Sequence, residues 1–394
     1  MANELPQPSP DAAAVSNELT QIIAAEIQSA GGWISFARYM ELALYTPGLG
    51  YYSGGSQKFG ESGDFMTAPE LTPLFGQALA RQVAQILRQI PPNEENLIVE
   101  IGGGSGRLAA DMLLALAELE CLPQRYLILE LSGELRARQS AALAQFAPAF
   151  AARVEWLDDL PASFSGCLIA NEVLDAMPTH AVRWDADGAR ERGVAIVDGR
   201  LVWAEPTAQR PIFFAAEKRG PAPNAYRFDG EVSLAVSAWM ATLGRRLCSG
   251  ALLLIDYGLP QRELYHPSRN GGTIRCHYRH RVHNDPFWYP GLSDITSHVD
   301  FTAVAEAGFD AGLEVLGYTN QASFLINCGL GELLQSRKGI VPVGAGDTPL
   351  KAVGAVNLLI SPNEMGELFK VIALGRGISQ PLLGFTPGNR IHAL

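Results

Sequence analysis

The residues of this chain with the clearest chemical potential lie in the stretch LIVEIGGGSGRLAADML, residues 97–113. Apolar residues 97–101 predict a buried strand, and residues 108–119 have the apolar spacing of a helix. Glycine between them permits positive φ and lets a ligand approach the main chain, and the helix offers free N–H groups to that ligand. One glycine would fit a plain tight turn, whereas four in five positions favour a ligand-binding loop. They are Gly102, Gly103, Gly104 and Gly106.

Two classes of ligand fit this loop. Starting at Gly104, the pattern Gly-x-Gly-x-x-Ala fits the dinucleotide fingerprint. Starting at Glu100, the pattern Glu-x-Gly-x-Gly-x-Gly resembles motif I of the class I S-adenosylmethionine methyltransferases. A carboxylate beside the turn would repel a pyrophosphate but attract a ligand that carries an ammonium and a sulfonium. The position of Glu100 therefore favours S-adenosylmethionine.

Further acidic residues follow the next two predicted strands. Glu130 ends the strand over residues 126–130 and is placed to accept the ribose hydroxyls of a bound nucleoside. Asp158 and Asp159 follow the strand over residues 154–156, where a carboxylate could bond an adenine amino group. Ordinary surface carboxylates explain Asp158 and Asp159 equally well, so both interpretations stay open.

Polar residues abruptly follow the fourth predicted strand, in the stretch GCLIANEVLDAMP. Ligands of open α/β sheets bind beyond the carboxyl ends of the strands, which is where Asn171, Glu172 and Asp175 are expected. Glu172 and Asp175 are three residues apart and would share one face if that turn is helical. Two carboxylates there could hold a planar cation by paired hydrogen bonds. The alternative is that they stabilise the N-terminus of a helix.

Alternation of strands and helices from residue 97 onward predicts an α/β fold with a parallel sheet. The expected strands cover residues 98–101, 126–130, 154–156, 167–170, 252–256, 313–318 and 368–373. Short alternating runs with Asp-Gly turns in residues 181–206 predict inserted β-hairpins.

The expected domain organisation is a helical and loop extension over residues 1–90, followed by one domain over residues 91–394. This domain would carry insertions at about residues 181–235 and 262–300. Residues 45–70 are rich in glycine and aromatic residues, and long loops of this kind are often functional. We expect them to cover the cofactor as a lid that contains Asp64, Thr67 and Glu70.

Composition excludes several classes of protein. The 394 residues are 47% hydrophobic and 18% charged, which is typical of a globular protein, and the net charge of −11 argues against nucleic acid or anionic membranes as partners. Five scattered cysteines suggest free thiols in a reducing compartment. With no signal peptide, no Arg-rich transit peptide and no membrane-spanning run, the chain is expected to be cytoplasmic. Its oligomeric state is left open.

The chain resembles the MidA-like methyltransferase family through a series of separate motifs in the same order. These are YTPGLGYY, GDFMTAPE, VEIGGGSGRLAADML, ANEVLDAMP, LLLIDYG, GGTIRCHYRH and DITSHVDF. The resemblance implies a Rossmann-like class I fold with a seven-stranded, mostly parallel sheet. It also implies S-adenosylmethionine as donor, S-adenosylhomocysteine as product, and symmetric dimethylation of a protein arginine. The absence of a transit peptide suggests a bacterial member, and the mitochondrial member assists assembly of a respiratory complex.

The cofactor would then be held by Glu100, the four glycines, Thr67, Glu130, Asp158 and Asn171, with Glu172 and Asp175 gripping the substrate guanidinium. The main rival is an assembly chaperone that binds the donor without catalysis, but it would not need these two carboxylates. A P-loop NTPase is excluded because no Gly-Lys-Ser/Thr occurs, and the Tyr-x-x-x-Lys pair of short-chain dehydrogenases is also absent. The run CHYRHRVH places His277, His280 and His283 three apart, a spacing that does not favour a metal site.

Overall fold

The computed structural model describes residues 5–54, 67–205, 212–221, 227–336 and 349–394. The chain forms two compact units. The sheet unit consists of Met66–Val173, Trp239–Gly258 and Phe301–Leu394. The hairpin unit consists of Met1–Phe65, Leu174–Ala238 and Leu259–Asp300.

This division differs from the expected extension over residues 1–90 and single domain over residues 91–394. Residues 66–90 belong to the sheet unit, because the helix they contain packs in its core. The two insertions join the N-terminal segment in a unit with its own apolar clusters. Such grouping depends on contacts between distant segments, which local sequence patterns do not reveal.

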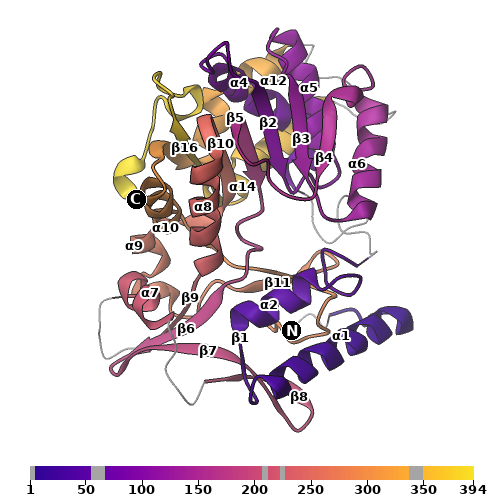
Figure 1. Ribbon diagram of the computed structural model, residues 1–394, viewed down its shortest axis with the longest axis vertical. Coiled ribbons are helices and arrows are strands. Elements are labelled where there is room, and N and C mark those ends of the chain that lie inside the picture. Colours follow the sequence, from indigo (N-terminus) through magenta and orange to yellow (C-terminus); the bar gives the residue numbers. More distant parts are fainter. Residues whose placement is uncertain (1–4, 55–66, 206–211, 222–226, 337–348) are drawn as a thin grey trace. The chain divides into compact units, whose positions relative to one another are not determined.

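The central sheet follows the path β15-β16-β10-β5-β2-β3-β4, which Figure 1 labels in part. Neighbours from β10 to β4 are parallel, whereas β16 is antiparallel to both β10 and β15. This path of seven strands confirms the mostly parallel sheet. The bounds are β2 Asn96–Ile101, β3 Arg125–Leu129, β4 Val154–Leu157, β5 Phe164–Asn171, β10 Leu247–Leu259, β15 Glu314–Asn320 and β16 Phe369–Arg376.

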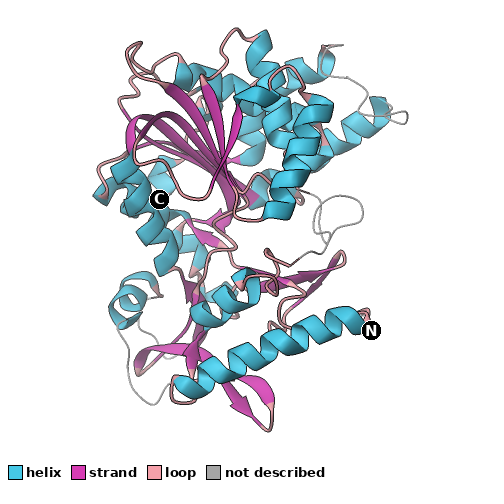
Figure 2. Ribbon diagram, turned by 45° about the vertical axis from the view of Figure 1, so that its right-hand side comes forward, coloured by secondary structure: helices cyan, strands magenta, loops and turns pink. Residues whose placement is uncertain are grey.

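Helices cover both sides of this sheet, as Figure 2 shows. Along β16, Val371 and Ala373 contribute to the main apolar core, while Leu374 on the opposite face contacts α10. A Cβ at Gly308 of α10 would lie 2.3 Å from Leu374 Cδ2, so this glycine allows the close packing. Burial on both faces explains why these strands are continuous apolar runs.

The helices of the sheet unit include the one expected over residues 108–119, which begins and ends one residue earlier. They are α3 Ala68–Leu71, α4 Pro73–Leu87, α5 Arg107–Glu118, α6 Gly133–Phe146, α10 Phe301–Asp310, α11 Gln321–Asn327, α12 Leu330–Gln335, α13 Pro349–Ile360 and α14 Met365–Leu368, and α8 Leu234–Arg246 begins in the hairpin unit. No helix in the described ranges is long and apolar enough to cross a membrane.

The hairpin unit is built on β6 His180–Asp185, β7 Gly188–Val197 and β8 Arg200–Ala204, which pair in antiparallel fashion. Ala186-Asp187 and Asp198-Gly199 make the connections, so the expected hairpins are confirmed. The unit also contains α1 Pro10–Ser29, β1 Ile34–Ser35, α2 Phe36–Tyr45, α7 Ile212–Arg219, β9 Phe228–Val232, α9 Gln261–Leu264, β11 Arg275–Tyr278, β12 Arg281–His283, β13 Asp294–Thr296 and β14 Val299–Asp300.

Candidate functional site

The glycine loop connects β2 to α5, and its glycines serve two different purposes. A Cβ at Gly103 would lie 2.9 Å from Ile128 Cγ2, and one at Gly106 would lie 2.8 Å from Gln139 Cα. These two glycines therefore allow close packing inside the sheet unit. Gly104 differs, because its φ is +51° and nothing lies within 4 Å of an added Cβ. The main chain at Gly104 is thus bare toward open space, where a ligand can approach it.

Gln139 on α6 connects this loop to Glu130. The side chain of Gln139 is fully buried, and its Nε2 donates to Gly104 O and to Glu130 Oε2, both at 3.1 Å. Its Oε1 accepts a hydrogen bond from Trp156 Nε1 at 2.8 Å. Sequence reasoning missed Gln139, since a polar residue within a helix of weak apolar spacing gives no signal of a role at a distant loop.

Glu130 directly follows β3 and has a fixed carboxylate. Its Oε1 accepts from Ser132 N at 2.9 Å, while Oε2 accepts from Gln139. Each carboxylate oxygen can accept more than one hydrogen bond, so Glu130 keeps capacity for the hydroxyl groups of a ribose.

Glu100 is the second-last residue of β2 and is buried, at 3% exposed. Tyr126 Oη donates to Glu100 Oε2 at 2.7 Å. Burial raises the pKa of Glu100 to about 7, the hydrogen bond from Tyr126 opposes that shift, and the negative charge of Glu130 adds to it. The charge argument for S-adenosylmethionine assumed a fully ionised carboxylate, but with this pKa Glu100 is only partly ionised at neutral pH.

The short helix α3 also contacts the glycine loop. Ser105 Oγ donates a hydrogen bond to Glu70 Oε1, which fixes this end of residues 45–70 to the loop. Thr67 is the N-cap residue of α3, and its side chain makes no capping hydrogen bond. Asp64 and the rest of residues 55–66 lie outside the described residues, so the role of the lid stays a prediction.

The turn after β5 is held by the neighbouring strand β10. Glu172 N donates to Ile255 O at 2.9 Å, and Val173 N donates to Asp256 Oδ2 at 3.1 Å. Asp256 is fully buried, and sequence reasoning missed this role. Glu172 has φ +54°, a left-handed conformation that is uncommon for a residue with a side chain.

Asn171, the last residue of β5, contains an unusual buried atom. Its Nδ2 donates to Glu172 Oε1 at 3.1 Å. Its Oδ1 is buried and has no hydrogen-bond partner among the described residues. Such an acceptor costs free energy unless a ligand supplies a donor.

Asp175 lies beyond the point where the chain passes from the sheet unit into the hairpin unit. Residues 172–179 form bends and a turn, so neither a shared helical face with Glu172 nor a helix N-terminus exists there. Both explanations that rest on a helix are therefore wrong. Asp175 is only 5% exposed, and its carbonyl oxygen accepts from Ser297 N at 3.0 Å.

Asp158 and Asp159, after β4, are 88% and 82% exposed. Asp158 pairs with Arg136, whose Nη2 lies 2.5 Å from Asp158 Oδ1. Arg136 also donates to the carbonyl oxygens of Glu130 and Leu157, so it joins the ends of β3 and β4. Asp158 is thus held near the ends of β3 and β4. A direct hydrogen bond from an adenine amino group to Asp158 stays a prediction.

The histidine run folds as the antiparallel hairpin β11–β12, in which Cys276 pairs with His283. Its histidines consequently do not lie on one helical face. Within the described ranges, no three His, Cys, Asp or Glu side chains are grouped so that they could hold a metal ion.

Comparison with known proteins agrees with this geometry. A family model of S-adenosyl-L-methionine-dependent methyltransferases matches residues 78–319. The mitochondrial protein arginine methyltransferase NDUFAF7 of Danio rerio is 27% identical over 378 residues, which cover 88% of this chain and 84% of that protein. NDUFAF7 of Mus musculus is 28% identical over 397 residues, which cover 92% of this chain and 86% of that protein.

Two crystal structures of COG1565 superfamily proteins from Burkholderia thailandensis match 99% of this chain and 100% of their own chains. One is bound to S-adenosyl-homocysteine and is 50% identical, with a TM-score of 0.91. The other is a native structure, 49% identical, with a TM-score of 0.89. The described fold is therefore one in which S-adenosyl-homocysteine has been seen bound.

Proposed function

Because the chain belongs to the S-adenosyl-L-methionine-dependent methyltransferase family, we propose that it transfers a methyl group to the guanidinium of a protein arginine. The observation that carries this proposal is the turn at the end of β5, where the backbone of Glu172 is left-handed and its carboxylate accepts a hydrogen bond from Asn171 Nδ2. The NDUFAF7 relatives are named protein arginine methyltransferases, which supports arginine as the substrate.

The residues of the sheet unit fit the cofactor. The bare main chain of Gly104 leaves room for it, Glu130 has acceptors for its ribose, and the buried Oδ1 of Asn171 needs a donor. When bound, S-adenosylmethionine supplies a methyl group on a positively charged sulfur, which is already activated for transfer. The protein then contributes mainly by aligning the two reactants and excluding water.

We assign Glu172 to the substrate guanidinium. A carboxylate accepts paired hydrogen bonds from a planar guanidinium, and this fixes the orientation of the attacking nitrogen. Asn171 Nδ2 donates to Glu172 Oε1 and so positions that carboxylate. Asp175 is proposed as a second carboxylate in substrate binding, to be tested separately because it belongs to the other unit.

Two finer features follow from the family resemblance and remain part of the proposal. The product would be symmetric dimethylarginine, and the methylated protein would be a subunit of a respiratory complex. Both features can be tested in a lysate of cells that lack this protein. The purified chain is added together with S-adenosylmethionine that carries a labelled methyl group, and the labelled proteins are identified.

The proposal expects one or a few labelled proteins, with the label recovered as symmetric dimethylarginine after acid hydrolysis. Gly104→Val, which should not bind the donor, is the matched control. If the wild-type chain binds S-adenosylhomocysteine but labels nothing, the non-catalytic assembly chaperone is the better account. Label recovered only on other amino acids would contradict the arginine substrate.

A further inference from the structure

The hairpin unit contains a cavity of about 570 Å³ that lies between its β-strands and the loop over residues 268–274. This volume is within the range of small-molecule sites. Its lining comes from β6, β7, β8, β9 and β11 as well as that loop, so segments far apart in the sequence build it. Residues that matter for its chemistry are Arg192, Trp203, Asp229, Glu231, Arg269 and Thr273.

Arg192 on β7 is the best-placed group in this cavity. Its guanidinium lies over the ring of Trp203, with 4.6 Å between the guanidinium carbon and the ring centroid. Its Nη1 is 3.4 Å from Asp229 Oδ2, which is the one ion pair of Arg192 with another described residue. A guanidinium has five N–H donors, so most donors of Arg192 are left for another partner.

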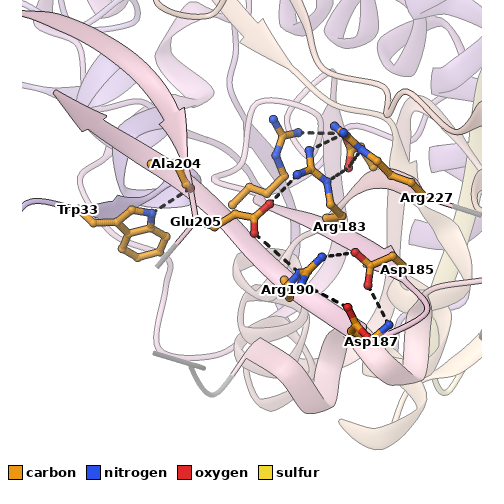
Figure 3. A network of polar contacts seen from close by, with 10 residues as sticks. Trp33, Arg183, Asp185, Asp187, Arg190, Ala204, Glu205 and Arg227 are labelled. Carbon is orange, nitrogen blue, oxygen red and sulfur yellow. Dashed lines mark hydrogen bonds and ion pairs between the residues drawn. The ribbon is translucent and has the colours of Figure 1, made fainter. Parts of the chain in front are cut away.

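Asp229 does not neutralise Arg192 fully, because other arginines already hold it. Its Oδ1 accepts from Arg183 Nε at 2.7 Å, and its Oδ2 accepts from Arg227 Nη2 at 2.8 Å. Figure 3 shows Arg183 and Arg227 within this network, together with Glu205, whose Oε1 is 2.5 Å from Arg183 Nη1. Three arginines thus share Asp229 in a chain whose net charge is −11.

Of the remaining charged groups of the lining, Arg269 and Arg275 are positive and Glu231 is negative. Arg269 is exposed and makes no ion pair with another residue that the structure describes. Glu231 accepts from Thr273 N and Oγ1, both at 2.9 Å, and burial raises the pKa of this carboxyl. Its hydrogen-bonding capacity is thus largely used inside the protein.

We propose that this cavity binds a carboxylate group, with Arg192 and Arg269 as the hydrogen-bond donors. A carboxylate matches the planar fork of a guanidinium. A phosphate dianion fits less well, because Asp229 and Glu231 also line the cavity and would repel a second negative charge. The source is either an acidic side chain of a protein segment or a free organic acid.

Titration calorimetry on the full chain, without methyl donor, tests this site. The probes are the capped tripeptide Ala-Glu-Ala and glutarate, each paired with its neutral counterpart, Ala-Gln-Ala or glutaramide. Saturable binding of a charged probe and not of its counterpart is expected. Binding of the tripeptide identifies a protein segment as the source, and binding of glutarate alone identifies a small acid. If neither charged probe binds, the proposal is wrong.

Variants then locate the binding. Arg269→Ala removes an exposed side chain and should weaken binding by about tenfold, the usual effect of losing a charged hydrogen bond. Arg192→Gln should do the same, and Arg200→Ala is the control, because Arg200 is an exposed arginine on β8 outside the lining. If Arg192→Gln fails to fold, the affinity of Arg269→Ala for the charged probe still tests the site. Unchanged affinity in Arg269→Ala would overturn the assignment, whatever the outcome for methyl transfer.

Discussion

Asn171 and Glu172, consecutive residues at the end of β5, are joined by a hydrogen bond of 3.1 Å from Asn171 Nδ2 to Glu172 Oε1. This bond uses the donor side of the amide and leaves Asn171 Oδ1 buried without a partner among the described residues. One residue therefore both orients a carboxylate and presents an acceptor for a ligand. This arrangement allows cofactor binding and substrate binding to be tested apart.

Gly104→Val is predicted to abolish binding of S-adenosylhomocysteine. Valine would fill the open space beside Gly104, and the positive φ would cost roughly 1–2 kcal/mol of stability. Titration calorimetry measures the binding, and a thermal melt checks the fold. Gly199→Val is the matched control, because Gly199 in the β7–β8 connection also has a positive φ, +74°, and nothing within 4 Å of an added Cβ. Normal binding by Gly104→Val would show that the ligand does not lie there.

Gln139→Leu is predicted to weaken binding of S-adenosylhomocysteine by about tenfold and to destabilise the fold by about 1–3 kcal/mol, since it leaves buried polar groups without this partner. Trp156→Phe breaks only the bond to Gln139 Oε1 and should leave affinity unchanged. Denaturant unfolding and titration calorimetry on both variants separate the effects. Equal loss of affinity in both variants would indicate that Gln139 acts through general stability alone.

Glu100 should make stability depend on pH. Burial raises its pKa from 4.5 to about 7, so the folded protein holds the proton more tightly than the unfolded chain does. The contribution of Glu100 to the free energy of unfolding is therefore most favourable below pH 4.5 and is lost as the pH rises through 7. Glu100→Gln cannot lose a proton and should gain about 1–3 kcal/mol relative to wild type between these limits.

Denaturant unfolding of wild type and Glu100→Gln at several pH values measures this difference. Asp111, whose pKa is also raised, is present in both proteins and cancels. Parallel pH profiles of the two proteins would contradict the raised pKa of Glu100.

Much of the sheet unit could be predicted from the sequence, because each strand is a short apolar run between turn signals. The glycine loop, Glu130 and the polar residues after β5 could also be placed, because parallel strands bring their carboxyl ends to one edge of the sheet. The strand over residues 252–256 was expected too short, since β10 extends over Leu247–Leu259.

The remaining features depend on contacts that no local pattern encodes. Gln139 and Asp256 reach the site from neighbouring elements, and neither position differs by residue type from many others in the chain. The grouping of residues 1–65 with both insertions also arises from packing between distant segments. The turn after β5 resembled a helix start because of its acidic residues, but hydrogen bonds from β10 hold it in another conformation.

The most direct measurement compares Glu172→Gln with wild type for both binding of S-adenosylhomocysteine and methyl transfer to arginine, on the same preparations. Glutamine keeps the shape of Glu172 but removes its charge, so affinity for the cofactor should persist. Loss of one charged hydrogen bond costs about 1.5–3 kcal/mol, so transfer should fall about tenfold to a hundredfold. Asp175→Asn, which removes the charge of the proposed second carboxylate, is measured in the same two assays. Full transfer by Glu172→Gln would contradict the proposed role of Glu172.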